Sequence, residues 1–277
     1  MSPRSVSEEF REEFREEFSE EFSEEFIDIS GVSLHVRSFY SGSFATPLLF
    51  LHEGLGSVDL WRDFPQAVVG ASGCPGFAYS RQGNGWSQPL SRPRQPDYMH
   101  SEAVDVLPIV IEDLAGGRPP VLIGHSDGAS IALIYAGSGY RVQGLVLIAP
   151  HVFVEPETIE SIAEIHESFS TSELPEKMAK YHTEPETTFR AWAEIWLSPA
   201  FRSWNIEEYL PGVSCPVLMV QGEEDEYGTA RQLDAIDRGI GRPGLRLMVP
   251  EANHSPHLQQ PELVIGAVVD FISGIRE

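Results

Sequence analysis

The feature that most constrains the fold is the segment at residues 121–130, which reads VLIGHSDGAS. A short apolar run leads into a pentapeptide of the pattern G-x-S-x-G, and a stretch of helical character follows it. Such a chain must turn sharply from a buried strand into a helix, with glycines avoiding collisions while the serine hydroxyl becomes exposed. A purely structural turn would also use these glycines. The strand before the motif and the helix after it favour a nucleophilic Ser126.

Apolar runs without polar alternation recur along the chain and are separated by segments of helical spacing. Runs of this kind predict a parallel sheet that is buried on both faces by helices. A first hairpin is expected over 27–29 and 32–37. The further strands are expected at 48–51, 76–80, 121–123, 145–149, 217–220 and 245–249, and the helices at 60–69, 98–115, 128–136, 228–238 and 261–273.

Residues 151–210 interrupt this alternation. They contain no strand-like run, only helical segments broken by prolines and rich in Glu and large aromatics. A helical insertion between two strands of a parallel sheet is expected to lie over the carboxyl edge of the sheet, where ligands bind. We therefore predict a cap over residues 151–210.

A serine nucleophile needs a base, and the base needs an orienting carboxylate. The later strands supply candidates for both: the run at 217–220 leads into QGEEDE, and the run at 245–249 leads into PEANHSPH. The chain order of serine, acid and histidine is that of hydrolases with a nucleophile elbow.

With these segments, the sequence resembles the α/β-hydrolase family over nearly all of residues 27–277. The segments that carry the resemblance are GHSDG, QGEED, NHSPHLQQPE and LHEGLGS; KYH, FRAWAEIWLSP and VQGEEDEYGT also look like those of small capped bacterial members of uncertain substrate. The resemblance implies an α/β-hydrolase fold, with a mostly parallel eight-stranded sheet, helices on both faces and a helical cap insertion. The core would then comprise 27–150 and 211–277.

The family pattern selects among several candidate acids and bases. It places the acid at Asp225, three residues after the glycine that ends the strand, and leaves Glu223, Glu224 and Glu226 as solvated loop charges. It places the base at His254. The second histidine of that segment, His257, is then expected to cap the following turn or to pack near the pocket entrance.

The same resemblance predicts an oxyanion hole made of two backbone N–H groups. One belongs to Asp127, directly after the nucleophile. The other is expected from Gly54, or from Leu55 if the loop bulges. Glu53 departs from the family pattern, which usually has Gly at this position. Its side chain is either exposed or lines the pocket and disfavours anionic substrates.

Further pocket candidates follow from the cap and from one loop of the core. Residues 79–87 resemble a glycine loop of the family whose usual role is structural, although Arg81 could instead hold a carboxylate. The candidates from the cap, each of which could equally belong to the core, are His151, Phe153, His182, Trp192 and Trp196.

Composition excludes several classes of function. The formal net charge of -23 disfavours binding to nucleic acid or to anionic membrane surfaces. No stretch approaches the roughly 20 apolar residues of a membrane span, and the N-terminus lacks the pattern of a secretory signal. Cys74 and Cys215 show no metal or redox spacing. We expect a cytoplasmic protein with a small-molecule substrate and without a metal or cofactor.

Residues 7–26 are five copies of a four-residue unit, SEEF or REEF. On a helix the Phe side chains would neighbour one another, but the stripe would drift and Glu would follow Glu at repulsive spacing. Residues 1–26 are therefore interpreted as a low-complexity extension that is disordered or a frayed helix. The alternative is an amphipathic helix that docks its Phe stripe, on the body or on a second subunit.

Three functions remain open at this level. The leading hypothesis is a serine hydrolase that acts on an ester, thioester, lactone or carbon–carbon bond. The alternatives are a triad-dependent lyase or synthase similar to the menaquinone-pathway enzyme of this fold, and a non-catalytic ligand-binding protein. If His254 is the base, activity should fall on the acid side, near or somewhat below neutrality.

Overall fold

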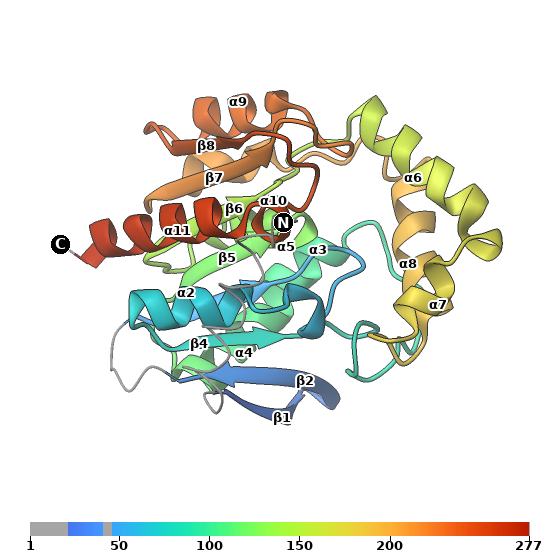
Figure 1. Ribbon diagram of the computed structural model, residues 1–277, viewed down its shortest axis with the longest axis horizontal. Coiled ribbons are helices and arrows are strands. Elements are labelled where there is room, and N and C mark those ends of the chain that lie inside the picture. The colour runs from blue at the N-terminus through green and yellow to red at the C-terminus, as the bar shows by residue number, and fades with distance from the viewer. Residues whose placement is uncertain (1–21, 41–45, 277) are drawn as a thin grey trace, which may run out of the picture.

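A computed structural model describes residues 22–40 and 46–276 of the chain. Its eight strands form one sheet in the order β1-β2-β4-β3-β5-β6-β7-β8 (Figure 1). β1 and β2 are antiparallel to their neighbours, and the remaining pairs are parallel. The strands are β1 (Phe22–Ile29), β2 (Val32–Phe39), β3 (Leu48–Leu51), β4 (Gly76–Tyr79), β5 (Val121–His125), β6 (Gly144–Ile148), β7 (Val217–Gly222) and β8 (Leu245–Val249).

Helices cover both faces of this sheet, as the apolar runs predict. The helices are α2 (Phe64–Ser72), α3 (Tyr98–Ser101), α4 (Leu107–Ala115), α5 (Asp127–Gly137), α6 (Pro156–Ser168), α7 (Leu174–Met178), α8 (Pro185–Leu197), α9 (Ala230–Gly239), α10 (Pro256–Gln259) and α11 (Pro261–Arg276). Successive strand residues point to opposite faces, so that Leu48 and Phe50 of β3 pack with α2 and α11, whereas Leu49 and Leu51 pack with α4, α5 and α9. The α/β-hydrolase architecture expected from the sequence is confirmed.

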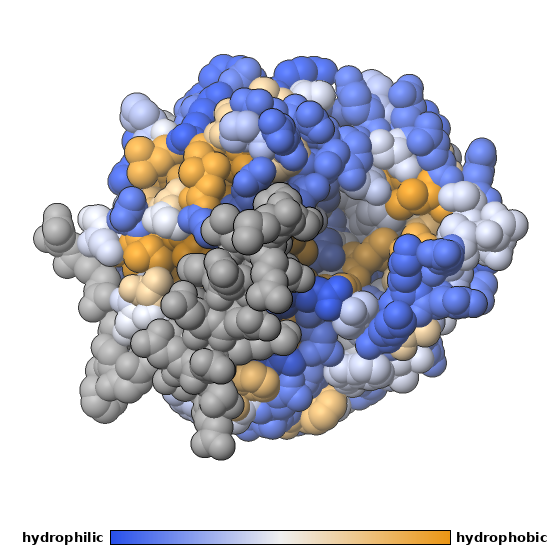
Figure 2. Space-filling view, in the orientation of Figure 1, coloured by the Kyte–Doolittle hydropathy of each residue, from blue (hydrophilic) through white to orange (hydrophobic). Residues whose placement is uncertain are grey.

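The main secondary-structure elements between β6 and β7 are the helices α6, α7 and α8. α6, α7 and α8 stand apart from the layers of the core in Figure 1. Figure 2 shows a hollow between the core and these helices, with apolar residues on its wall. None of the helices in the described part of the chain is long and apolar enough to cross a bilayer.

The N-terminal boundary expected at residue 26 is wrong, because the last repeat unit belongs to the sheet. Residues 22–26 form the first part of β1 rather than a helix or a disordered tail. A period of four is also an even number of strand residues, so Phe22, Glu24 and Phe26 share one face of β1. Phe26 contacts His35 across the two strands, and Glu24 forms an ion pair with Arg37. In a helix Glu24 would face other glutamates of the repeat, whereas in the strand it faces an arginine, which attracts it. Residues 1–21, with Phe10, Phe14 and Phe18, lie outside the described residues.

Candidate active site

The serine lies at a strained turn between β5 and α5. Ser126 has a φ of 52°, a left-handed conformation that is unfavourable for a residue with a side chain. The turn has no room for larger neighbours: a Cβ atom on Gly124 would lie 2.4 Å from the carbonyl oxygen of Gly128, and a Cβ on Gly128 would lie 1.9 Å from that of Leu51. The two glycines therefore permit the close packing that presents the hydroxyl at the sheet edge.

Three side chains from the ends of three strands form a hydrogen-bonded chain. Ser126 Oγ lies 2.9 Å from His254 Nε2, and His254 Nδ1 lies 2.8 Å from Asp225 Oδ1. An ionised carboxylate only accepts, so Nδ1 must donate to Asp225. In the neutral histidine, Nε2 is then the acceptor for the Ser126 hydroxyl. This tautomer is the one a general base requires.

Asp225 is held in place by donors other than the histidine. Its Oδ1 also accepts the N–H groups of Tyr227, at 2.9 Å, and Gly228, at 3.3 Å, while Oδ2 accepts from the amide of Gln221 at 2.8 Å. Burial opposes ionisation, but the charge and hydrogen bond of His254 and the N–H of Tyr227 outweigh it and hold the pKa of Asp225 below its ordinary value. Asp225 is therefore a carboxylate at neutral pH.

The competing acids and the second histidine do not join this chain. Glu223 and Glu224 are exposed, and Glu226 accepts the backbone N–H of His254 at 3.1 Å rather than its ring. His257 is buried with its ring centroid 5.2 Å from that of Trp61 and 4.7 Å from that of His125. Burial, and to a smaller extent the neighbouring histidines, lower the pKa of His257 well below its ordinary value. His257 is therefore uncharged at neutral pH and packs against these rings.

The backbone of the loop after β3 is held by hydrogen bonds from two side chains of the loop after β4. The Arg81 guanidinium donates to the carbonyl oxygens of His52, at 2.6 Å, and Glu53, at 2.8 Å. Asn84 donates to that of Gly54 at 3.1 Å. In a trans peptide the next N–H points opposite to the carbonyl, so the N–H groups of Gly54 and Leu55 are turned away from Arg81 and Asn84. This orientation suits either residue as an oxyanion donor.

Asp127 directly follows the serine, and its backbone and its carboxyl group have different surroundings. It is the first residue of α5, where an N–H has no acceptor within the helix. Its side chain is fully buried, and Oδ2 accepts from the hydroxyl of Tyr98 at 2.5 Å. Burial raises the pKa of this carboxyl group. The side chain is absent from the residues that line the cavity beside Ser126.

The cavity beside Ser126 has a volume of about 200 Å³ and lies between the core and the helical insertion. Four of the seven predicted pocket residues line it, namely Glu53, His151, Trp192 and Trp196. Several other lining residues were not predicted from the sequence. Two of them, Thr158 and Ile162, could have been predicted, because they lie four residues apart and so share one face of α6. The remaining lining residues are Gly54, Leu55, His125, Ser126, Glu226, Tyr227, His254 and Ser255.

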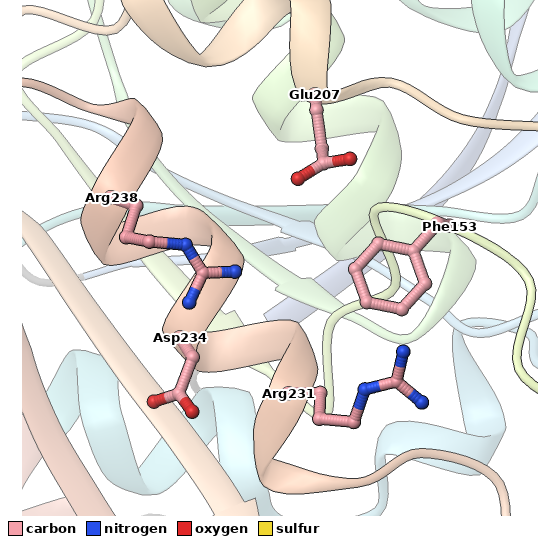
Figure 3. Close-up of a pocket in the computed structure, with 5 residues that line it drawn as sticks. All are labelled: Phe153, Glu207, Arg231, Asp234 and Arg238. Atoms are coloured by element: carbon pink, nitrogen blue, oxygen red, sulfur yellow. The ribbon is translucent and has the colours of Figure 1, made fainter.

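Three predicted pocket residues lie elsewhere, namely Arg81, Phe153 and His182. Arg81 cannot hold a substrate carboxylate there, because its guanidinium is committed to the loop carbonyls described above. Phe153 lines a separate cavity of about 410 Å³, where the ring lies among the other labelled side chains of Figure 3. Its backbone pairs with Asn205 and the Arg231 guanidinium lies 5.7 Å from its ring, so local contacts direct it away from Ser126.

His151 brings an uncharged ring to the cavity wall. Its ring centroid lies 5.6 Å from that of His254 and 5.4 Å from that of Trp196. Burial, reinforced by the neighbouring His254, lowers the pKa of His151 to about 3. At neutral pH it adds no charge to the cavity. His182, by contrast, accepts the backbone N–H of Gly85 and ties the insertion to the core.

Comparison with known proteins places this geometry in context. The sequence model of the "Alpha/beta hydrolase family" matches residues 48–267. A human protein, "Serine hydrolase BPHL", is 25% identical over 252 residues, which is 89% of this chain and 85% of that protein. The enol-lactonase of Burkholderia xenovorans LB400 superimposes with a TM-score of 0.69 at 17% identity, covering 90% and 100% of the two chains. A malate-bound esterase of Thermogutta terrifontis superimposes with a TM-score of 0.68 at 21% identity, covering 92% of this chain and 100% of the esterase chain.

Proposed function

The chain belongs to the α/β-hydrolase family, and from that premise we propose that it is a serine hydrolase acting by acyl transfer on a small carbonyl substrate. The observation that carries the proposal is the hydrogen-bonded chain from Ser126 Oγ through the His254 ring to Asp225, with separations of 2.9 and 2.8 Å. The names of the human relative and of the two superimposed structures agree with a hydrolase.

In the proposed reaction, His254 Nε2 accepts the proton of Ser126 as Oγ attacks the substrate carbonyl carbon. The negative charge that develops on the carbonyl oxygen is stabilised by the N–H groups of Asp127 and of Gly54 or Leu55. His254 then gives its proton to the leaving group, and an acyl-enzyme forms. Water, deprotonated by the same histidine, attacks the acyl carbon, which releases the acid and restores Ser126.

The surroundings limit the size of the acyl group. A Cβ atom on Gly54 would lie 2.2 Å from Trp192 Nε1, so α8 presses directly on the proposed oxyanion loop. The cavity of about 200 Å³ is below the usual range for sites that enclose drug-sized ligands. We propose that residues 151–210 act as a cap that encloses a small acyl group, whichever of the ester, thioester, lactone or carbon–carbon bonds is cleaved.

The direct test combines covalent labelling with turnover. We expect a fluorophosphonate probe to add to Ser126, with the adduct located by peptide mass spectrometry. Short-chain p-nitrophenyl esters should release one equivalent of nitrophenol in a burst before steady turnover if deacylation is slow. A lyase could be labelled but would release no acid from these esters. Absence of both labelling and ester hydrolysis would contradict the proposal.

The pH dependence of this hydrolysis should report His254. Burial lowers its pKa, but the charge and hydrogen bond of Asp225, with a smaller effect of Glu226, outweigh burial and raise the pKa above 6.5. Only the unprotonated ring can accept the serine proton, so kcat/KM should be full above this pKa and fall about tenfold per pH unit below it. The acid limb should therefore have its midpoint above 6.5. A flat kcat/KM profile from about pH 5 to about pH 8 would rule out His254 as the base.

A further inference from the structure

The cavity beside Ser126 carries negative charge on its wall. Two carboxylates line it, those of Glu53 and Glu226, and none of the described residues that line it is Lys or Arg. Glu226 is the less committed to a fixed position, since its carboxylate receives one N–H and the residue is exposed. The whole chain carries a net charge of -23. A field of this sign concentrates cations and repels anions from the entrance.

Glu53 is the carboxylate that matters most, because of its position in the loop. It directly precedes Gly54, one of the two candidate oxyanion donors, and its side chain keeps 29% of its surface exposed. Burial opposes its ionisation, but the contact with His125 outweighs burial and lowers the pKa of Glu53. A fixed negative charge at this place disfavours the oxyanion of the transition state by Coulomb repulsion.

The histidine next to Glu53 is His125, and its ring does not hydrogen-bond to the carboxylate. His125 Nε2 lies 2.8 Å from the carbonyl oxygen of His254, and since a carbonyl only accepts, this nitrogen carries the proton. The other nitrogen, Nδ1, lies 3.6 Å from Glu53 Oε2. At 3.6 Å this separation is longer than a hydrogen bond. The Glu53 carboxylate, which lines the cavity, is therefore not tied to that nitrogen and can turn toward a cation beside Ser126.

Aromatic rings complete the wall. Trp192 and Trp196 reach the cavity from α8, and Tyr227 reaches it from the loop that holds Asp225. The faces of aromatic rings attract cations, and Trp does so most strongly. Carboxylates together with aromatic side chains, and without a basic side chain among the described lining residues, form surroundings that suit an alkylammonium group and do not suit a carboxylate.

We propose that the Ser126 pocket selects esters that carry a cationic ammonium group, with Glu53 as the specificity-determining carboxylate. This inference rests on the proposed function, because it names the substrate class of the same site. The substrate cation offsets the Glu53 charge next to the developing oxyanion. Esters that carry a carboxylate are rejected by the same charge.

The test uses three p-nitrophenyl esters that differ only in the terminal group of the acyl chain. They are the ester of trimethylammoniobutyrate, its carbon isostere with a tert-butyl group, and the half-ester of glutarate. We expect kcat/KM of the wild-type protein to be about tenfold higher for the cationic ester than for the neutral one, and lowest for the anionic one. In Glu53→Gln the ratio of cationic to neutral should fall severalfold, to the smaller preference that Glu226 and the aromatic rings provide.

Glu223→Gln is the matched control. It makes the same change of net charge in an exposed side chain that does not line the cavity, so the cationic-to-neutral ratio should stay at its wild-type value. Glu53→Asp, which keeps the charge, should retain a preference for the cation. Equal ratios in the wild type and in Glu53→Gln, or a preference for the glutarate ester, would overturn the proposal.

A binding measurement separates this proposal from the proposed function. Choline and the alcohol in which a tert-butyl group replaces the trimethylammonium group are titrated calorimetrically into the Ser126→Ala protein. We expect choline to bind about tenfold more tightly, and this difference to shrink severalfold when Glu53→Gln is added. If no ester is hydrolysed but choline retains this advantage, the hydrolase function fails and the cation site stands. Equal affinities would disprove the cation site itself.

Discussion

Ser126→Ala should lower kcat for any ester that the wild-type protein hydrolyses by about a million-fold, to the level left by the oxyanion hole and substrate binding alone. The hydroxyl that attacks the carbonyl carbon is removed, while His254 and Asp225 remain. The fold should survive, because the change removes one hydrogen bond, typically worth about 1 kcal/mol. Initial rates with short-chain p-nitrophenyl esters measure the loss, and circular dichroism during thermal unfolding monitors the fold.

Ser138→Ala provides the control for this experiment. Ser138 lies at the other end of α5, is exposed and is far along the helix from the turn. Its alanine variant should keep the wild-type rate and the fluorophosphonate adduct, whereas Ser126→Ala should lose both. Retention of more than about a thousandth of the wild-type kcat by a folded Ser126→Ala protein would show that another group is the nucleophile.

Much of the fold and of the candidate site could be predicted because the fold itself dictates where strand ends meet. The apolar runs at 121–123, 217–220 and 245–249 lie within β5, β7 and β8. Parallel strands place their carboxyl ends on one edge of the sheet, so a serine, an acid and a histidine that each follow a strand are brought together. The separations of 2.9 and 2.8 Å within Ser126–His254–Asp225 agree with that reasoning.

The predictions that failed depended on contacts between distant segments. Residues 22–26 of the repeat are compatible with a helix or a strand, and what selects the strand is their pairing with β2, including Arg37 opposite Glu24. Likewise, Arg81 is one of the few basic residues near the site, but the loop carbonyls of His52 and Glu53 take up its donors. Neither partner can be identified from local spacing alone.

The acid of the site is the second residue with a large expected effect. Asp225→Asn should lower kcat by about ten thousand-fold. Asp225 Oδ1 accepts three donors and Oδ2 accepts a fourth, but an asparagine has only one oxygen. If that oxygen stays with the N–H groups of Tyr227 and Gly228, the amide nitrogen faces the donor of Gln221. If the amide flips, it faces His254 and favours the wrong tautomer.

The Asp225→Asn substitution also removes the negative charge beside His254, which gives a second measurable effect. The carboxylate raises the pKa of His254, so its removal should lower that pKa, and an NMR titration of the imidazole should show the protonation midpoint at lower pH than in the wild type. Glu224→Gln makes the same charge change in an exposed side chain of the same loop and should change neither kcat nor the titration. A loss of less than about tenfold for Asp225→Asn, or an unmoved titration, would mean that Asp225 neither orients His254 nor stabilises its protonated form, since a triad carboxylate does both.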